Sequence, residues 1–257
     1  MSQPVAYIHP DAKIGANVTI SPFAYISGDV VIGDGTWIGP NVTIFDGARI
    51  GKDCQIFPGA VISAVPQDLK FSGEYTTTEI GDRTSIRECV TIHRGTTDKM
   101  KTVVGSDCLL MGYVHIAHDC IVGNHCIFAN YAALSGHCVV GDYAIIEGQA
   151  GAGQFIHIGA HTFIAGTTAI RKNVPPFVKA AREPISYMGI NAIGLRRRGF
   201  SEEKINTIQD IYRVLFQKGV NISQALEIIK RDFPASPERE QIIDFVLMSD
   251  KGIINRG

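Results

Sequence analysis

The sequence predicts a parallel β-helix followed by a small C-terminal helical domain, and two observations carry this prediction. First, an apolar residue recurs at every sixth position from Ile8 onward and fills 25 of the 28 such positions between 8 and 170. Second, beyond Pro175-Pro176 the apolar residues recur at the three- and four-residue spacing of amphipathic helices. The 257-residue chain is 45% hydrophobic and 19% charged, so it can bury a core and is not disordered.

A period of six residues fits neither a helix nor a two-faced strand. It fits a prism with three flat sides, in which each side is a short strand with one inward residue and ends in a turn. Three hexapeptides close one coil, stacked about 4.8 Å from the next, so residues 18 apart become neighbours. Glycine often follows the repeated apolar residue, as at Gly15, Gly33 and Gly51, and we expect these glycines to occupy corners with unusual backbone angles.

The cysteines follow the same repeat. Five of the six occupy the small inward position two residues before the repeated apolar residue: Cys54, Cys108, Cys120, Cys126 and Cys138. Only Cys89 does not. We interpret the thiols as small core residues, because the chain has no CxxC pair, no common zinc spacing and no sign of a secreted disulfide framework.

Two breaks interrupt the repeat without changing its phase. Residues 63–79 are expected to form a loop extruded from one coil, and residues 96–102 a second surface excursion. Loops held by a rigid scaffold often carry binding groups. Gln67, Asp68 and Lys70 are the candidates in the first loop, and a solvated loop without a binding role is the alternative.

The predicted domains are the β-helix over residues 1–175 and the helical domain over 176–257, because double proline continues neither a ladder nor a helix. Ser201 is the expected N-cap of the first long helix. Apolar stripes then predict three helices, carried by Ile205, Ile208, Tyr212 and Leu215, by Ile222, Leu226 and Ile229, and by Ile242, Phe245 and Leu247.

Charge and targeting signals exclude several classes of protein. The net charge of −1 gives no general bias toward nucleic acid. No run approaches 18 apolar residues, so no membrane span is expected, and the N-terminal sequence lacks the basic and apolar regions of a secretory signal. The sequence therefore predicts a cytoplasmic protein.

Among the eight histidines, His118 is the best candidate for chemistry. Asp119 follows it and can orient its imidazole, and the 18-residue coil stacks His118 beside Gly136 and Asp119 beside His137. An imidazole of pKa ~6.5 can remove a proton from a hydroxyl near neutrality. A glycine N–H can stabilise the oxyanion of a tetrahedral intermediate. This pair suits acyl transfer, with a plain surface histidine as the alternative.

Several segments carry a resemblance to a known family: QDLKFSGE, HIAHDCIVGNHCI, LSGH and GLRRRGFS. Together they resemble the acyl-carrier-protein:UDP-N-acetylglucosamine O-acyltransferases, which begin lipid A synthesis, over essentially the whole chain. The resemblance implies that the β-helix is left-handed. The six-residue repeat alone does not determine the handedness. The resemblance also implies a homotrimer with active sites between subunits, and an (R)-3-hydroxyacyl group delivered by acyl carrier protein without a further cofactor.

The resemblance also assigns roles to residues. It places the catalytic base at His118, with Asp119 orienting it, and the oxyanion donor at the Gly136 amide. Substrate contacts are implied at Gln67, Asp68, Lys70, His115, His137 and Gln154, and contacts to the nucleotide part at Asn191, Arg197 and Arg198. Gly166 matches a position that helps to set acyl length, and since glycine blocks nothing, we expect a long chain rather than a ten-carbon one.

Two positions depart from the family pattern. Gly153 stands where many members carry histidine, and Ile193 where some place an acidic residue near the nucleotide. Cations near the start of the tail, among them Arg171, Lys172 and Arg182, are expected to meet the diphosphate and an acidic carrier.

The residues alone leave four alternative functions open. They are the sister N-acyltransferase of the same pathway, an acetyl-CoA-dependent hexapeptide acetyltransferase, a zinc hydratase and a purely structural solenoid. No metal is expected, because no H-x4-H pair occurs. The repeat starts at Ile8 and leaves no room for the extra N-terminal domain of the sister enzyme. A 3-hydroxy and a 3-amino sugar acceptor both fit the proposed chemistry.

Overall fold

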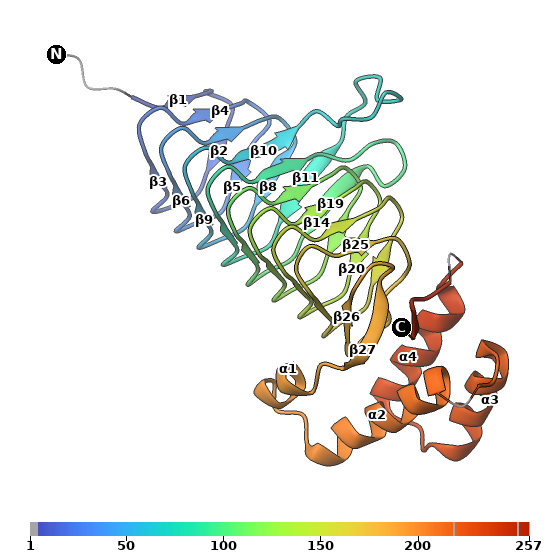
Figure 1. The fold of residues 1–257 in the computed structure, drawn as a ribbon. Coiled ribbons are helices and arrows are strands. Elements are labelled where there is room, and N and C mark those ends of the chain that lie inside the picture. Colours follow the sequence, from blue (N-terminus) through green and yellow to red (C-terminus); the bar gives the residue numbers. More distant parts are fainter. Residues whose placement is uncertain (1–4, 218, 251, 257) are drawn as a thin grey trace.

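The chain folds as a parallel β-helix capped at one end by four helices (Figure 1). The computed structural model describes residues 5–217, 219–250 and 252–256. Each of the strands β1 to β25 contains one of the repeated apolar residues, and the three strands of a coil belong to three different sheets. Each hexapeptide therefore forms one side of a triangular coil, as the six-residue period predicts.

The three sheets are called A, B and C here. Sheet A contains β1 (Tyr7–Ile8), β4 (Tyr25–Ile26), β7 (Thr43–Ile44), β10 (Val61–Ala64), β13 (Thr91–His93), β16 (His115–Ile116), β19 (Ala133–Leu134), β22 (Gly151–Ala152) and β25 (Ala169–Ile170). Sheet B contains β2 (Lys13–Ile14), β5 (Val31–Ile32), β8 (Ala48–Ile50), β11 (Thr77–Ile80), β14 (Lys101–Val104), β17 (Ile121–Val122), β20 (Val139–Val140) and β23 (His157–Ile158). Sheet C contains β3 (Thr19–Ile20), β6 (Trp37–Ile38), β9 (Gln55–Ile56), β12 (Ser85–Ile86), β15 (Leu109–Leu110), β18 (Ile127–Phe128), β21 (Ile145–Ile146) and β24 (Phe163–Ile164), followed by the C-terminal strands β26 (Val178–Ala181), β27 (Ser186–Ile190) and β28 (Asn255–Arg256).

The pairing register shows how the two breaks are absorbed. Ile32 pairs with Ile50, 18 residues on, as predicted. Ile50 then pairs with Ile80, and Ile80 with Val104, so the separation rises where each loop is inserted and returns to 18 at Val122. Both insertions lie between a sheet A strand and the next sheet B strand. The repeated apolar residues therefore continue to point into the core after each loop.

The core of the β-helix is the stack of repeated apolar residues. From Ile26 to Ile170 these side chains are at most 4% exposed, whereas Ile8 is 41% exposed because the first coil has no neighbour below it. The five cysteines of the small inward position are buried and reduced, and Cys89 is half-buried. The interpretation of these thiols as core residues is thus confirmed.

The reason predicted for the repeated glycines is wrong. Gly15, Gly33 and Gly51 do not have positive φ; the left-handed corners are taken by other residues, such as Asn17 and Asp53. A Cβ placed on Gly33 would lie 2.6 Å from the carbonyl carbon and oxygen of Gly51 in the next coil. These positions therefore require glycine because successive coils approach closely there, and not because of their backbone angles.

The C-terminal part begins with strands before it becomes helical. β26 extends sheet C in parallel with β24, β27 pairs antiparallel with β26, and β28 pairs with β27. The expectation of a helical segment from residue 176 is therefore corrected over residues 178–190. The strands form because Val178 and Ala180 are buried at the last coil and extend its core.

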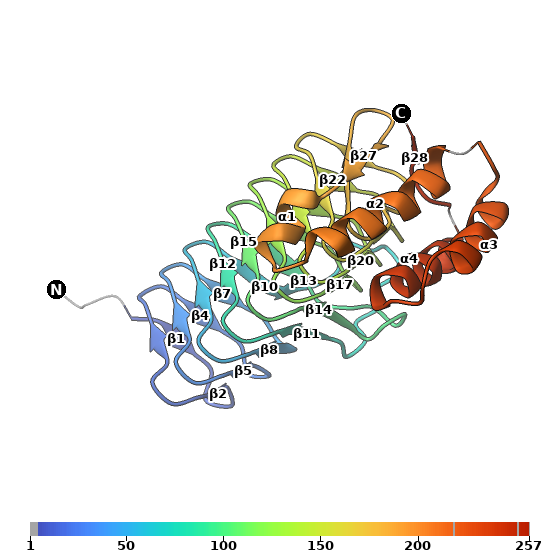
Figure 2. The ribbon, with the colours of Figure 1, turned by 90° about the horizontal axis from the view of Figure 1, so that it is seen from below.

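Four helices follow and gather at the C-terminal end of the β-helix (Figure 2): α1 (Ala192–Arg197), α2 (Glu202–Gln217), α3 (Ile222–Asp232) and α4 (Pro237–Met248). The three predicted helices are present, and the short α1 was not predicted. Leu247, expected in the apolar stripe of α4, is 63% exposed. None of the helices in the described part of the chain has the length and apolar content needed to span a bilayer.

Candidate active site

The candidate catalytic residues lie at one corner of the prism, the turns that lead from sheet A to sheet B, called the A–B corner here. His118 and Asp119 follow β16, and Gly136 and His137 follow β19 in the next coil. The two extruded loops leave β10 and β13 at this same corner, and both project from one edge of the molecule (Figure 1). Parts of the chain that are distant in sequence are thus brought together by the topology.

His118 packs directly against Gly136, as the 18-residue coil predicts. A Cβ placed on Gly136 would lie 2.5 Å from Cε1 and 2.7 Å from Nε2 of His118. The His137 N–H donates to the His118 carbonyl oxygen at 3.0 Å. Only a residue without a side chain leaves room for the imidazole here, so the glycine is a steric requirement of the site.

The Gly136 N–H is available to a ligand. Within the described residues it makes no hydrogen bond, whereas its neighbours Ser135 and His137 both donate to the backbone. The imidazole of His118 lies beside it and is 6% exposed. A proton acceptor and an unused amide donor therefore sit side by side in a sheltered place, the arrangement that oxyanion stabilisation needs.

Asp119 fixes the imidazole of His118. Its Oδ2 lies 2.8 Å from Nδ1 of His118, and the carboxylate is fully buried. Burial alone would raise the pKa of Asp119, but hydrogen bonds from Thr96 and His118 outweigh it and hold the pKa below its ordinary value of 3.8. The ionised carboxylate can only accept a hydrogen bond, so it selects the tautomer in which Nδ1 carries the hydrogen and Nε2 carries the lone pair.

The loop at 96–102 supplies groups to the site that the sequence did not reveal. Thr96 donates to Asp119 through Oγ1 at 2.6 Å and through its backbone N–H, and the Lys99 N–H donates at 3.1 Å. Asp98 accepts from Nδ1 of His137 at 2.8 Å. The loop is thus more than the expected surface excursion. A sequence signal for this contact was the position of the break, which lies one coil before His118.

Two further histidines, His93 and His115, lie near the His118–Asp119 pair. Nδ1 of His115 contacts Thr91 Oγ1 at 2.7 Å, and the rings of His115 and His93 pack edge to face with centroids 4.9 Å apart. His93 was not predicted as a site residue; it is 5% exposed, and its Nδ1 makes no hydrogen bond in the described structure. Burial, with help from His115 and His118, lowers the pKa of His93 to about 4.

The buried, neutral His93 should make stability pH-dependent. Its folded pKa of about 4 lies below the unfolded value of ~6.5, so the unfolded chain binds more protons between these values and stability falls as pH falls. Between pH 7 and 5 the wild type should lose up to about 2 kcal/mol more unfolding free energy than His93→Asn. Urea unfolding at one fixed protein concentration measures this. Parallel losses in the two proteins would contradict the assignment.

The other predicted site residues fall into two groups. Gln67, Asp68 and Lys70 lie in the first loop at the A–B corner, where the Lys70 N–H donates to Asp68 Oδ1 at 3.0 Å, and Gln154 lies at this corner one coil beyond Gly136. Asn191, Arg197 and Arg198 lie elsewhere, near sheet C and α1. One chain therefore does not bring its predicted nucleotide residues to His118.

Two of the three predicted nucleotide residues, Asn191 and Arg197, line a separate cavity. A cavity of about 210 Å³ lies between sheet C and α1, with Asn191, Arg197 and the exposed Ile193 in its lining. Asn191 is also the N-cap of α1, because its Oδ1 accepts from the Gly194 N–H. Arg198 stacks on Tyr143 and donates to the Tyr143 carbonyl oxygen at 3.0 Å.

His118, Asp119 and His137 are close enough together to be considered as metal ligands. The carboxylate of Asp119, however, already receives hydrogen bonds from the Thr96 N–H and Oγ1, the Lys99 N–H and His118. A carboxylate offers about four lone-pair sites, so its acceptor capacity is used. These hydrogen bonds favour Asp119 as the residue that orients the His118 imidazole over Asp119 as a metal ligand.

Comparison with known proteins identifies the family. The family model described as UDP N-acetylglucosamine O-acyltransferase, domain 2, matches residues 173–254, and the bacterial transferase hexapeptide model matches 29–64 and 101–136. The acyl-[acyl-carrier-protein]–UDP-N-acetylglucosamine O-acyltransferase of Chlorobium phaeobacteroides is 61% identical over 93% of this chain and 91% of its own length. The protein of that name from Aliivibrio salmonicida is 47% identical, over 98% of this chain and 96% of its own length.

Solved structures agree. A UDP-N-acetylglucosamine acyltransferase from Bacteroides fragilis superposes with a TM-score of 0.97 at 52% identity, over 99% of this chain and 100% of that one. The predicted resemblance and the predicted fold class, a left-handed parallel β-helix with C-terminal helices, are both confirmed. The chain is a member of the acyl-[acyl-carrier-protein]–UDP-N-acetylglucosamine O-acyltransferase family.

Proposed function

We propose that this chain transfers an (R)-3-hydroxyacyl group from acyl carrier protein to the 3-hydroxyl of UDP-N-acetylglucosamine, the first step of lipid A synthesis, with His118 as general base. The observation that carries the proposal is the His118–Asp119 dyad packed against the unused Gly136 amide. The donor and the acceptor are those after which the relatives from Chlorobium phaeobacteroides and Aliivibrio salmonicida are named. Such a reaction would take place in the cytoplasm.

In the proposed mechanism, Nε2 of His118 takes the proton of the sugar 3-hydroxyl while Asp119 stabilises the imidazolium that forms. The sugar oxygen attacks the thioester carbonyl carbon, and the Gly136 N–H donates to the resulting oxyanion. The intermediate collapses with cleavage of the C–S bond, and His118 returns its proton to the departing phosphopantetheine thiolate. The products are the 3-O-acyl sugar nucleotide and free carrier thiol, and the base is regenerated.

The test is thioester consumption by the purified protein with a panel of acyl carrier thioesters and with acetyl-CoA. It is run with UDP-N-acetylglucosamine, with its 3-amino analogue and without sugar. The proposal expects sugar-dependent release of carrier thiol with the 3-hydroxy sugar. Transfer only from acetyl-CoA, or no sugar-dependent release from any thioester, would refute it.

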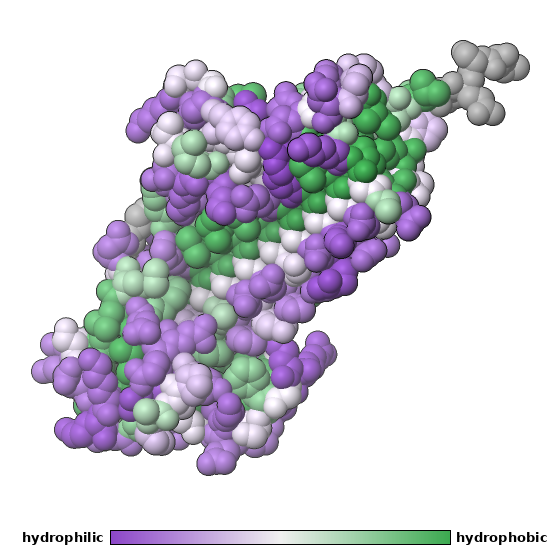
Figure 3. All heavy atoms as spheres, turned by 180° about the vertical axis from the view of Figure 1, so that it is seen from behind, coloured by the Kyte–Doolittle hydropathy of each residue, from purple (hydrophilic) through white to green (hydrophobic). Residues whose placement is uncertain are grey.

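We infer that the working form is a homotrimer with its sites between subunits. The separation of Asn191, Arg197 and Arg198 from the A–B corner supports this, because a neighbouring copy could bring them to His118. A band of hydrophobic residues also runs along the β-helix (Figure 3), and exposed apolar bands of this kind mark interfaces. Mixing inactive His118→Ala with inactive Arg197→Ala chains and recovering activity would support shared sites.

The reaction as proposed uses no metal. The acceptor capacity of Asp119 is used by hydrogen bonds, and the chemistry needs only a base and an oxyanion donor. Turnover should therefore be unchanged after dialysis against a strong chelator such as EDTA. Loss of activity that added Zn²⁺ restores would overturn this part of the proposal and favour a metal at His118, Asp119 and His137.

Gly166 should favour a long acyl chain. It is half-buried at the corner between sheets C and A, where an added Cβ would lie 3.1 Å from the Gly148 carbonyl oxygen. A larger side chain would occupy space needed by distal methylenes, each worth about 0.8 kcal/mol when buried. Gly166→Met should lower the ratio of kcat/KM for a long donor to that for a ten-carbon donor by about 10-fold or more. The ratio cancels any loss of folded enzyme, and an unchanged ratio would contradict the role of Gly166.

A further inference from the structure

The loop at 96–102 places a second carboxylate beside the candidate active site. Asp98 stands at one of the three sixth positions that are not apolar, and the chain leaves the coil there, between β13 and β14. Its side chain is 56% exposed, and its Oδ2 accepts from Nδ1 of His137 at 2.8 Å. Among the described residues, the Asp98 carboxylate makes no other hydrogen bond or ion pair. The fold thus directs this carboxylate to one imidazole.

The turn that carries Asp98 is anchored on both sides of it. The Met100 N–H donates to the Thr96 carbonyl oxygen at 2.8 Å, which closes the turn. Thr96, two residues before Asp98, and the N–H of Lys99, one residue after it, both donate to the buried Asp119. These anchors fix where the Asp98 carboxylate lies. One short turn therefore positions two carboxylates, one beside each imidazole of the corner.

Packing fixes the ring of His137, and Asp98 fixes its hydrogen. The ring stacks on Phe155 with centroids 4.3 Å apart and meets the His118 ring edge to face at 5.0 Å. Asp119 Oδ2 lies 4.0 Å from Nδ1 of His137, which is too far for a hydrogen bond. Because an ionised carboxylate can only accept, Asp98 selects the tautomer with the hydrogen on Nδ1. Nε2 of His137 then carries the lone pair.

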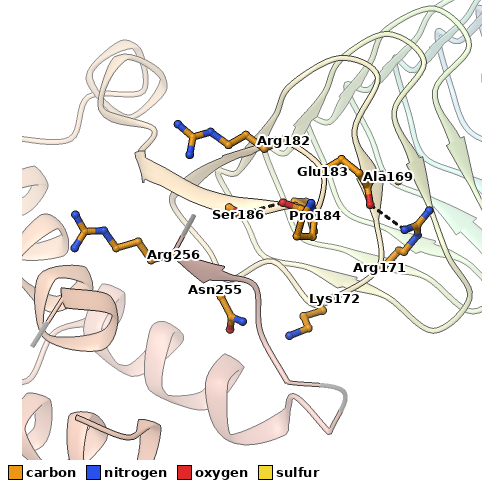
Figure 4. Close-up of a pocket in the computed structure, with 10 residues that line it drawn as sticks. Ala169, Arg171, Lys172, Arg182, Glu183, Pro184, Ser186, Asn255 and Arg256 are labelled. Carbon is orange, nitrogen blue, oxygen red and sulfur yellow. Dashed lines mark hydrogen bonds and ion pairs between the residues drawn. The ribbon is translucent and has the colours of Figure 1, made fainter. Parts of the chain in front are cut away.

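Convergence on one group separates this turn from the charged cavity at the C-terminal end of the β-helix. Four cations line that cavity, whose volume is about 450 Å³: Arg171, Lys172, Arg182 and Arg256. Their charged ends point in different directions, and Arg171 already pairs with Glu183 at 2.8 Å (Figure 4). These four side chains therefore offer no single binding point, whereas Asp98 reaches a ring of the candidate active site.

We propose that Asp98 is a positioning residue, which holds His137 in the tautomer whose Nε2 accepts a hydrogen bond from a substrate hydroxyl. The inference rests on the proposed acyl transfer, in which the sugar and the 3-hydroxyacyl chain both carry hydroxyls. His137 packs on His118, beside which the two substrates would meet. Without Asp98 either ring nitrogen can carry the hydrogen, so only part of the enzyme would offer this acceptor.

The kinetic test is Asp98→Ala. It should raise the KM of one substrate about 3–10-fold and leave kcat within about two-fold of wild type, because the lost hydrogen bond acts in binding. The substrate whose KM rises, the UDP-sugar or the acyl carrier thioester, is the one that supplies the hydroxyl. Asp98→Asn keeps an acceptor oxygen and should restore that KM to within about two-fold of wild type. A wild-type KM for both substrates in Asp98→Ala would overturn the inference.

Asp11→Ala is the matched control. Asp11 lies beside Nδ1 of His9 at the same A–B corner, in the first coil, and should leave both KM values and kcat unchanged. A double-mutant cycle then shows whether Asp98 acts through His137. Asp98→Ala/His137→Ala should be no worse than His137→Ala alone, since residues that act as a unit are not additive. Losses that multiply would overturn the inference.

A measurement without substrate separates this inference from the proposed function. In protein labelled with isotope-enriched histidine, the NMR signals missing from His137→Ala identify His137. They should show the hydrogen on Nδ1 in wild type and in Asp11→Ala, and a mixture of tautomers in Asp98→Ala. A tautomer that Asp98→Ala leaves unchanged would overturn the inference even in an active enzyme. A wild type with the expected tautomer that acylates no sugar would refute the proposed function and the substrate role of His137, but not its positioning by Asp98.

Discussion

Replacing His118 with alanine is expected to lower kcat by about 10²–10⁴-fold, the usual contribution of a general base. The reason is the position of the imidazole: Nδ1 is held by the buried Asp119 at 2.8 Å, and Nε2 lies beside the Gly136 amide. KM for the sugar should change far less than kcat, because the base acts in the transition state. Steady-state kinetics with a saturating long-chain donor measures both.

The matched control for this variant is His125→Ala. His125 lies at a different corner, between sheets B and C, where it is exposed and stacks on Tyr143. It should retain near wild-type turnover. A His118→Ala enzyme with the secondary structure and the kcat of the wild type would remove His118 from the mechanism.

Gly136→Ala is expected to be nearly as damaging, although it adds only one methyl group. The new Cβ would lie 2.5 Å from Cε1 of His118, so the imidazole must move away from the reacting atoms. A displacement of about 1 Å can cost about 10²-fold in rate, and the oxyanion donor would shift with it. We expect kcat to fall by about 10²–10³-fold.

Gly153→Ala is the control for this substitution. It lies at the same corner one coil on, but a Cβ there would meet nothing closer than the Ile170 carbonyl oxygen at 3.7 Å, an ordinary contact. It should leave the rate within a few fold of wild type. If Gly136→Ala were equally mild, the steric account of the site would be wrong.

The repeating part of the structure could be predicted from the sequence because each coil repeats the same packing problem. The inward residue must be apolar at every sixth position, so the register from Ile26 to Ile170 follows from counting. The contacts of His118 with Gly136 and of Asp119 with His137 are consequences of the same count. The repeat did not reveal why these positions are glycine. The reason is the short distance between the backbones of successive coils at Gly33, which a count along the sequence does not provide.

The parts that interrupt the repeat could not be predicted in this way. The hydrogen bonds of Thr96 and Lys99 to Asp119 arise where a loop folds back over the corner, and no period describes that path. His93 looked like any other histidine, because its burial depends on what packs around it. The strands at 178–190 were missed because the double proline was interpreted as an end of the ladder, whereas the core continues at Val178 beyond it.

The most direct test of the central claim, that coil stacking makes His118 and Gly136 a single catalytic unit, is the kcat of the double variant His118→Ala/Gly136→Ala beside the two single variants. Without the imidazole, the methyl group at residue 136 has nothing to displace. The double variant should therefore be at most a few fold slower than His118→Ala alone, since effects within one unit do not add. Losses that multiply, so that the double variant falls by the product of the two single effects, would show that the two residues act independently and would contradict the account.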